Sequence, residues 1–146
     1  MKIQFGIYSI QTKRVNQQPF IYDIIRKKWI VITPEEQVRQ VWIHYLIYNL
    51  GISESKIAVE KGLKINGKIK RFDICVYDNL LQPNILIECK APNLILSTPN
   101  FEQLANYNIA LKANKFILTN GVSHLGYQIS NNKIEAIDTL IENTLG

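Results

Sequence analysis

Three charged residues, Asp73, Glu88 and Lys90, adjoin apolar segments and carry side chains that could do chemistry together. Glu88 and Lys90 end the run ILIECK, which is otherwise apolar. Because side chains alternate along a β-strand, these two charged groups are expected to share one face of the strand. The opposite face is then expected to hold Ile85, Ile87 and Cys89.

The preceding apolar stretch, RFDICVY, contains Asp73. Alternation groups Asp73 with Arg71 and Cys75, opposite Phe72, Ile74 and Val76. If Asp73 faces the same side as Glu88, two carboxylates and an ammonium group converge. Two carboxylates with a backbone carbonyl make an oxygen site that suits Mg²⁺ or Mn²⁺.

A lysine beside such a site can orient or deprotonate an attacking water and offset charge on a phosphoryl group. This combination is what the hydrolysis of a phosphodiester bond requires. The competing interpretation is a salt bridge between Lys90 and Glu88 or Asp73 at the end of a strand, which contributes roughly 0–1 kcal/mol when exposed.

A helix is expected to precede these strands. Thr33 is suited to the N-cap, Pro34 to the first helical position, and Glu36 can close a capping box. The helix should run from Pro34 to about Leu50 and end at Gly51. Its apolar residues form a wide stripe that predicts burial. They are Val38, Val41, Trp42, Tyr45, Leu46 and Tyr48.

The remaining elements are expected from hydrophobic periodicity and turn residues. Asn66-Gly67 is a strong signal for a β-hairpin, and Asn131-Asn132 suggests a second one near the end of the chain. The expected strands span about 56–62, 69–77, 84–89, 115–119, 127–129 and 133–137. The second helix is expected from about Pro99 to Ala113. Residues 1–32 read as extended segments interrupted by basic residues. The order is helix, three strands, helix, strand and a trailing hairpin.

Composition fits one globular domain spanning residues 1–146, with a core at about 20–130. Hydrophobic residues make up 47% and charged residues 20% of the 146 positions, which excludes disordered and fibrous proteins. The net charge of +5 favours a polyanionic partner. Two cysteines without C-x-x-C spacing indicate a reducing cytoplasm, and neither a signal peptide nor a membrane span is expected.

Other enzyme classes receive little support. The stretch GLKINGK lacks the Ser or Thr that a phosphate-binding loop needs, and its Asn-Gly turn leads into a strand. His44 and His124 are isolated from other metal-ligand residues in the sequence. No serine lies in a G-x-S-x-G context.

Asp73 followed by Glu88-Cys89-Lys90, between two helices, resembles the D…E-x-K signature of the PD-(D/E)XK nuclease superfamily. Phe72 stands where the signature has proline. Gln103 and Tyr107 in QLANY resemble the Q-x-x-x-Y motif of RecB-like nucleases and of type I restriction subunits. The segment RKKWIVITPEEQVRQ is similar to the start of the N-terminal nuclease domain of those subunits. The resemblance covers roughly residues 20–130.

This resemblance implies an α/β restriction-endonuclease-like fold, in which helices flank a central mixed sheet with an αβββαβ core and a trailing hairpin. It implies that Asp73, Glu88 and the carbonyl of Cys89 bind Mg²⁺ or Mn²⁺, with Lys90 as the catalytic lysine. Glu36 is a further metal-ligand candidate on the first helix, although the capping box explains it equally well.

The resemblance also gives Gln103 and Tyr107 a place near the scissile phosphate. They are four residues apart and therefore adjacent on one helix face. The alternative is a solvated glutamine and a packed tyrosine.

A basic run between residues 61 and 71 is a candidate for contacts with DNA phosphates that do not read sequence. Its members are Lys61, Lys64, Lys68, Lys70 and Arg71. The alternative is that these side chains discourage edge-to-edge pairing of an exposed strand.

The function expected from these residues is metal-dependent endonucleolytic cleavage of DNA in the cytoplasm. The resemblance implies partners in a type I restriction-modification system, namely translocase, methylation and specificity subunits. Cleavage of both strands with one active site per chain would favour a homodimer. The alternatives are a non-catalytic nucleic-acid-binding module that keeps the nuclease fold, and a scaffold or oligomerisation domain.

Overall fold

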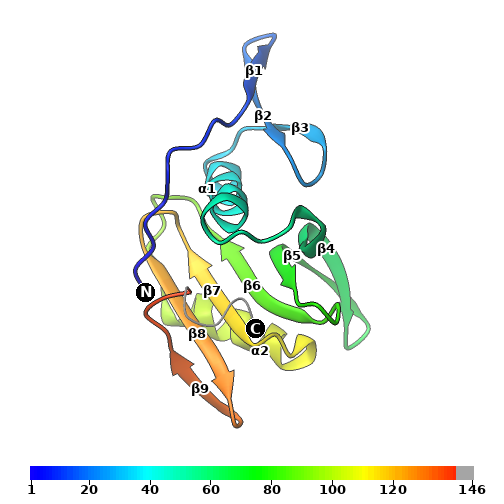
Figure 1. Ribbon diagram of the computed structural model, residues 1–146, viewed down its shortest axis with the longest axis vertical. Helices are drawn as coiled ribbons and strands as arrows, with labels where there is room; N and C mark the ends of the chain where they lie inside the picture. The colour runs from blue at the N-terminus through cyan, green and yellow to red at the C-terminus, as the bar shows by residue number, and fades with distance from the viewer. Residues whose placement is uncertain (141–146) are drawn as a thin grey trace.

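The computed structural model describes residues 1–140, apart from the side chains of Leu63, Ile65, Tyr107, Ile109 and Ala110. A six-stranded sheet is covered by α1 on one face and by α2 on the other, and a smaller three-stranded sheet projects beyond α1 (Figure 1). The helical segments are α1 (Pro34–His44), which continues into a π-helical turn (Tyr45–Asn49), a short 3₁₀ helix (Glu54–Lys56), and α2 (Thr98–Leu111). The strands are β1 (Thr12–Val15), β2 (Gln18–Asp23), β3 (Lys28–Val31), β4 (Ile57–Ile65), β5 (Lys68–Tyr77), β6 (Pro83–Cys89), β7 (Lys115–Thr119), β8 (His124–Ser130) and β9 (Lys133–Ala136).

The large sheet is mixed and has the order β4-β5-β6-β7-β8-β9. β6 and β7 run parallel, and α2 provides the crossover between them, whereas the other neighbouring strands run antiparallel. The sequence α1, β4, β5, β6, α2, β7 is the predicted αβββαβ core, and β8 and β9 form the predicted trailing hairpin. The predicted fold class is therefore confirmed.

Local signals in the sequence explain several element boundaries. Thr33 caps α1 by accepting a hydrogen bond from the N–H of Glu36 at 3.1 Å, as predicted. Asn66 and Gly67 both have positive φ, of 49° and 77°, which is the conformation that a two-residue hairpin turn needs. Gly51 follows the π-helical turn with φ of 66°. The second helix ends at Leu111, followed by Lys112 as a C-cap in a left-handed conformation, rather than at Ala113 as the sequence suggested.

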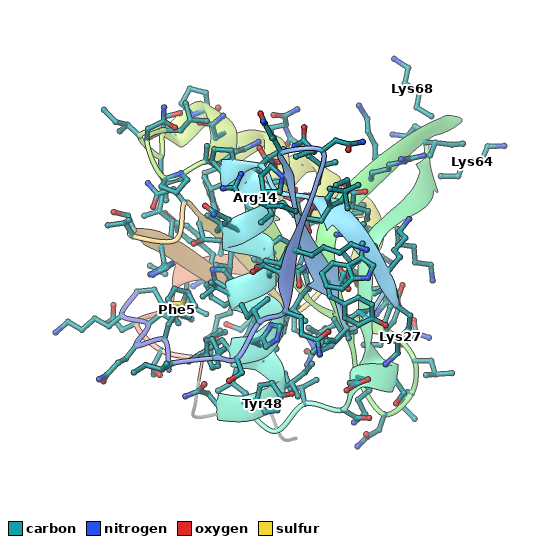
Figure 2. All side chains as sticks on the ribbon, turned by 90° about the horizontal axis from the view of Figure 1, so that it is seen from above. Phe5, Arg14, Lys27, Tyr48, Lys64 and Lys68 are labelled. Atoms are coloured by element: carbon teal, nitrogen blue, oxygen red, sulfur yellow. The ribbon has the colours of Figure 1, made fainter. Side chains whose placement is uncertain are left out.

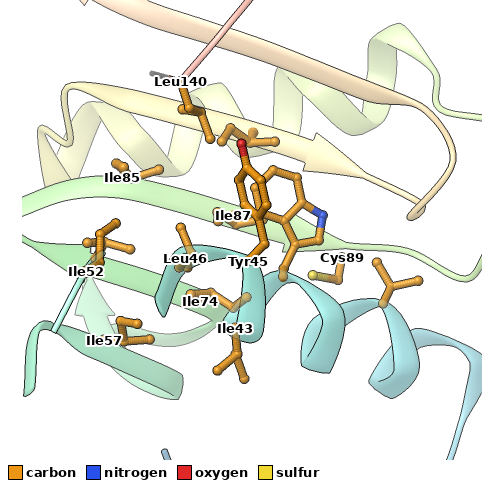
Figure 3. Close-up of a cluster of buried hydrophobic side chains, with 14 residues drawn as sticks. Ile43, Tyr45, Leu46, Ile52, Ile57, Ile74, Ile85, Ile87, Cys89 and Leu140 are labelled. Atoms are coloured by element: carbon orange, nitrogen blue, oxygen red, sulfur yellow. The ribbon is translucent and has the colours of Figure 1, made fainter. Parts of the chain in front are cut away.

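The core consists of two layers of apolar side chains on the two faces of the sheet. Figure 3 shows the α1-side layer, in which Ile43 and Leu46 meet Ile74, Ile85 and Ile87 from β5 and β6. The α2-side layer contains Phe72, Cys75, Leu86, Leu104, Phe116 and Leu118. Most of the predicted helix stripe is buried, but Tyr48 is exposed, because the chain widens into a π-helical turn before it reaches this residue.

The small sheet, in the order β1-β2-β3, was predicted only as extended segments. Its first turn uses Asn16 and Gln17, both with positive φ, and therefore lacks the glycine that usually marks such turns. Trp29 lies against Tyr22 across the sheet, and the Lys13 ammonium lies 4.3 Å from the centre of a Trp29 ring. Neither helix in the described part of the chain has the length and apolar character needed to cross a membrane.

Candidate active site

The end of β6 carries Glu88 and Lys90 on the face that α2 covers, as strand alternation predicted. The Lys90 ammonium lies 3.4 Å from Oε1 of Glu88, and both side chains are half-buried. Cys89 points to the opposite face and is fully buried in the α1-side core. The N–H of Lys90 donates to the carbonyl oxygen of Thr119 at 2.7 Å, so β7 holds this strand end in place.

Asp73 lies at a break in the regular alternation of β5. Phe72 and Cys75 both pack on the α2 side, whereas Ile74 packs on the α1 side. The predicted alternation through residues 71–76 is therefore wrong at Phe72, which shares the α2 side with Cys75 instead of lying opposite it. Pairing between β5 and β6 begins at Ile74, opposite Ile87, so the two strands are not paired next to Asp73.

The Asp73 carboxylate is held where the two strands separate. Its Oδ2 accepts a hydrogen bond from the N–H of Cys89 at 2.7 Å, and its Oδ1 accepts one from Nη2 of Arg39 at 2.6 Å. The carboxylate therefore links β5, β6 and α1. This position follows from tertiary contacts, which strand alternation does not describe.

Asp73 and Glu88 are close enough to influence each other's charge. Burial and the neighbouring Asp73 carboxylate together raise the pKa of Glu88 to about 7, against the opposing effect of Lys90. Burial and like charge both disfavour a second ionised carboxylate. This end of the sheet therefore concentrates negative charge that a bound cation would offset.

Glu36, the predicted metal-ligand candidate on the first helix, belongs to a buried network of ion pairs. Its Oε1 lies 2.5 Å from Nη2 of Arg26 and accepts from Nε2 of Gln40 at 3.0 Å, while its Oε2 binds Nη1 of Arg39. Arg26 also binds the buried carboxylate of Asp23 at 2.6 Å. The role of Glu36 as a metal ligand stays a prediction, and its role as the partner of two arginines is evident in the structure.

The neighbouring Glu35 lies within electrostatic reach of the candidate site. Burial raises the pKa of Glu35, Asp73 raises it further, and Lys90 lowers it. Nothing in the sequence singles out Glu35 or Arg39, because their positions on a helix give no sign of which carboxylate or arginine faces a strand end.

A cavity of about 180 Å³ opens beside Glu88 and Lys90. Gln103 and Leu104 of α2 form one wall, so the structure brings the predicted Gln103 together with the charged pair. The full lining is Lys70, Arg71, Glu88, Lys90, Asn100, Gln103 and Leu104. Tyr107 belongs to α2, but its side chain lies outside the described residues.

The predicted basic run divides into three groups. Lys70 and Arg71 line the cavity. Lys64 and Lys68 lie at the tip of the β4–β5 hairpin, which extends beyond the body of the protein (Figure 2). Lys61 lies with its ammonium 5.0 Å from the centre of the Tyr77 ring. Lys70 and Arg71 are therefore the members that could contact a substrate in this cavity.

The mixed sheet between two helices, with acidic groups and a lysine at one strand end, defines a restriction-endonuclease-like domain. Residues 34–140 match the family described as type I restriction enzyme R protein N terminus, and the chain belongs to this family. No curated protein matches the sequence.

Among solved structures, the type IIG restriction endonuclease BpuSI resembles the chain with a TM-score of 0.47 and 17% sequence identity. The similarity covers 66% of this chain and 12% of that enzyme, so the chain spans a small part of its length. Family membership makes this a nuclease-related domain.

Proposed function

We propose that this domain hydrolyses DNA phosphodiester bonds with the help of Mg²⁺ or Mn²⁺. The observation that carries the proposal is the cavity in which Glu88, Lys90 and Gln103 meet two basic residues, Lys70 and Arg71. Negative and positive groups in one small cavity suit a bound cation together with an anionic phosphodiester. Membership of a restriction-enzyme family supports the same reaction class.

The available ligands fit a magnesium-type ion. Within residues 1–140, no three His, Cys, Asp or Glu side chains gather into a ready metal-binding group. Mg²⁺, however, commonly takes one or two carboxylates and keeps several waters, and the concentrated negative charge of Asp73 and Glu88 favours a cation. Asp73, Glu88 and the carbonyl of Cys89 would hold it. When bound, such an ion lowers the pKa of a coordinated water and polarises a phosphoryl oxygen.

The protein's own groups would supply position and charge. Lys90, next to Glu88, would orient the attacking water and offset charge that develops on the phosphoryl oxygens. Gln103 and Tyr107 would contact the scissile phosphate or orient Lys90 from α2. Lys70 and Arg71 would hold neighbouring phosphates.

A non-catalytic nucleic-acid-binding module is the second candidate. The ion pair of 2.6 Å between Arg39 and Asp73 favours it, because an arginine already neutralises one of the two proposed ligands. Such a module would bind DNA equally well in chelator. Catalysis would instead depend on the divalent ion.

Family membership also supports a role inside a larger assembly. We propose that the domain acts in the cytoplasm beside translocase, methylation and specificity subunits of a restriction system. Pairing of two chains would bring two active sites to the two DNA strands.

Cleavage of supercoiled plasmid tests the proposed function. Wild-type protein, Lys90→Ala and the control Lys133→Ala would be compared in Mg²⁺, Mn²⁺ and chelator. Lys133 is an exposed lysine on β9, so the control removes the same charge away from the cavity. The proposal predicts nicked or linear product from wild type and control only, and only with metal. Cleavage that persists in Lys90→Ala would contradict it, and metal-independent binding without cleavage would support the second candidate.

A further inference from the structure

A second cavity, of about 490 Å³, lies between β3 and the β4–β5 hairpin. Arg71 lines both this cavity and the candidate active site, so the two cavities share a wall. Lys28 of β3 stands in the wall opposite the hairpin. The full lining is Arg26, Lys28, Val59, Glu60, Gly62, Ile69 and Arg71. Figure 2, in which the small sheet is nearest the viewer, shows the hairpin that ends in Lys64 and Lys68 extending beside it.

The charges in this second cavity favour an anion. Three cationic side chains face one carboxylate, that of Glu60. Arg26 is already bound by Asp23 and Glu36, and its Nη1 lies 3.4 Å from Glu60. Arg26 is thus neutralised by its carboxylate partners, and Glu60 is shared between Arg26 and Arg39. Lys28 and Arg71 are exposed and form no ion pair within residues 1–140, so they supply the excess positive charge.

A third cavity at the same edge of the sheet is lined by an excess of negative charge. It measures about 510 Å³ and lies between the start of α1 and β3. Glu35, Glu36 and Glu60 line it against two cations, Arg26 and Arg39. A polyanion that leaves the candidate active site is therefore attracted past Arg71 towards Lys28 and repelled from the third cavity.

We propose that a DNA strand bound at the candidate active site continues past Arg71 into the groove between β3 and the β4–β5 hairpin. There Lys28 and Arg71 bind successive backbone phosphates. The small β1–β3 sheet thus forms the second wall of the binding groove. It lies before residues 34–140, the segment that matches the family. The inference rests on the proposed function for the identity of the polyanion.

The chemistry of the groove suits phosphates better than base edges. Lysine and arginine on exposed strands contact the backbone and position a duplex without reading its sequence. Each phosphate contact releases counterions, so its loss changes the salt dependence of binding in a defined way. The groove should therefore bind different DNA sequences with similar affinity.

Fluorescence anisotropy of a labelled DNA duplex, in chelator, tests the inference without requiring cleavage. The proteins are wild type, Lys28→Ala, Arg71→Ala and the control Lys133→Ala. Loss of one phosphate contact should weaken binding about eightfold at about 0.1 M salt and reduce the slope of log affinity against log salt by about 0.9. Lys28→Ala should show this change with duplexes of unrelated sequence. Circular dichroism would verify that each variant is folded.

The outcomes separate the inference from the proposed function. Lys28→Ala with the affinity and salt slope of Lys133→Ala would overturn the inference, even if wild-type protein cleaves DNA. A weakened Lys28→Ala, together with no metal-dependent cleavage by wild type, would support the groove and contradict the nuclease proposal. If neither wild type nor any variant binds the duplex, the inference is overturned, and plasmid cleavage alone decides the nuclease proposal.

Discussion

Two clusters of charged side chains lie at the same edge of the sheet, and they differ in how their charges are balanced. The cluster on the α1 side joins Glu36 and Asp73 to Arg39 and Arg26 through short, buried ion pairs. The cluster on the α2 side holds Glu88 and Lys90 3.4 Å apart, half-buried beside a cavity.

The difference indicates that the two clusters have different roles, one in folding and one in ligand binding. Buried, well-paired charges fix the geometry of the elements they join, and removal of one partner is costly. Half-buried charges that face a cavity and repel a neighbouring carboxylate contribute little to folding and suit ligand binding. Asp73 belongs to both clusters, because Arg39 and the N–H of Cys89 hold its carboxylate next to Glu88. The structural cluster therefore positions one of the groups proposed to bind the metal.

Substitution of Glu88 in the α2-side cluster should affect catalysis far more than stability, and this is the largest effect expected. Glu88→Gln should lower metal-dependent DNA cleavage by at least about 100-fold, because it removes a proposed ligand, while the free energy of unfolding changes by less than about 1 kcal/mol. Single-turnover cleavage and urea unfolding would measure the two quantities. A variant that loses stability but cleaves normally once folded would show that Glu88 is structural.

Removal of Arg39 should be the most costly single change for folding. Arg39→Met leaves Asp73 buried without its guanidinium partner and Glu36 with Arg26 alone, and we expect a loss of about 3–5 kcal/mol in the free energy of unfolding. The matched control is Glu54→Gln, which breaks the exposed ion pair with Lys27 and should cost less than about 1 kcal/mol. Equal losses in urea unfolding for the two variants would refute the structural role of the buried cluster.

His124 makes the stability of the α1-side core depend on pH. Burial and the N-terminal ammonium, which donates to the His124 carbonyl oxygen, together lower its pKa to about 4. The ring accepts or donates a hydrogen bond at Thr119 and packs against Phe5 and Trp42. The folded state therefore disfavours the charged imidazole.

The unfolded chain takes up this proton near pH 6.5 and the folded protein only near pH 4. The contribution of His124 to the free energy of unfolding should therefore fall by up to about 3 kcal/mol as the pH drops from 6.5 to 4. Above pH 6.5 this contribution should stay constant. His124→Phe, which cannot titrate, should lose this part of the pH slope. Denaturant unfolding of wild type and His124→Phe at a series of pH values would measure how the free energy of unfolding changes with pH. The same pH dependence in both proteins would argue against a buried neutral histidine.

The cap of α1 gives the smallest expected effect. Thr33→Ala should cost about 1 kcal/mol, because the N–H of Glu36 loses its acceptor. Ser97 is the natural control, since it precedes α2 without capping it through its side chain. Ser97→Ala should therefore cost less in thermal unfolding, and the reverse order would contradict the assignment of Thr33 as a cap.

Local features of the sequence predicted much of the fold. The start of α1 at Thr33-Pro34 and the Asn66-Gly67 turn depend on the properties of adjacent residues, and both were predicted correctly. The first turn of the small sheet was missed, because Asn16-Gln17 adopts positive φ without a glycine.

Features that depend on distant contacts were not predictable in the same way. Alternation placed Glu88 and Lys90 together, but it failed at Phe72. It also could not predict that Arg39, on another element, holds the Asp73 carboxylate. On a helix considered alone, an arginine is expected to be exposed and a tyrosine in the apolar stripe to be buried. In the structure Arg39 is buried and Tyr48 is exposed. The sequence could therefore predict the charged pair on β6, but not the buried network behind it.

The central claim is that a divalent ion binds between Asp73 and Glu88 on the cavity side of the sheet edge. Calorimetric titration with Mn²⁺ of wild type, Glu88→Gln and Glu36→Gln tests this most directly. We predict that wild type and folded Glu36→Gln bind one ion per chain and that Glu88→Gln has lost this binding. Equal Mn²⁺ affinity in wild type and Glu88→Gln would contradict the account.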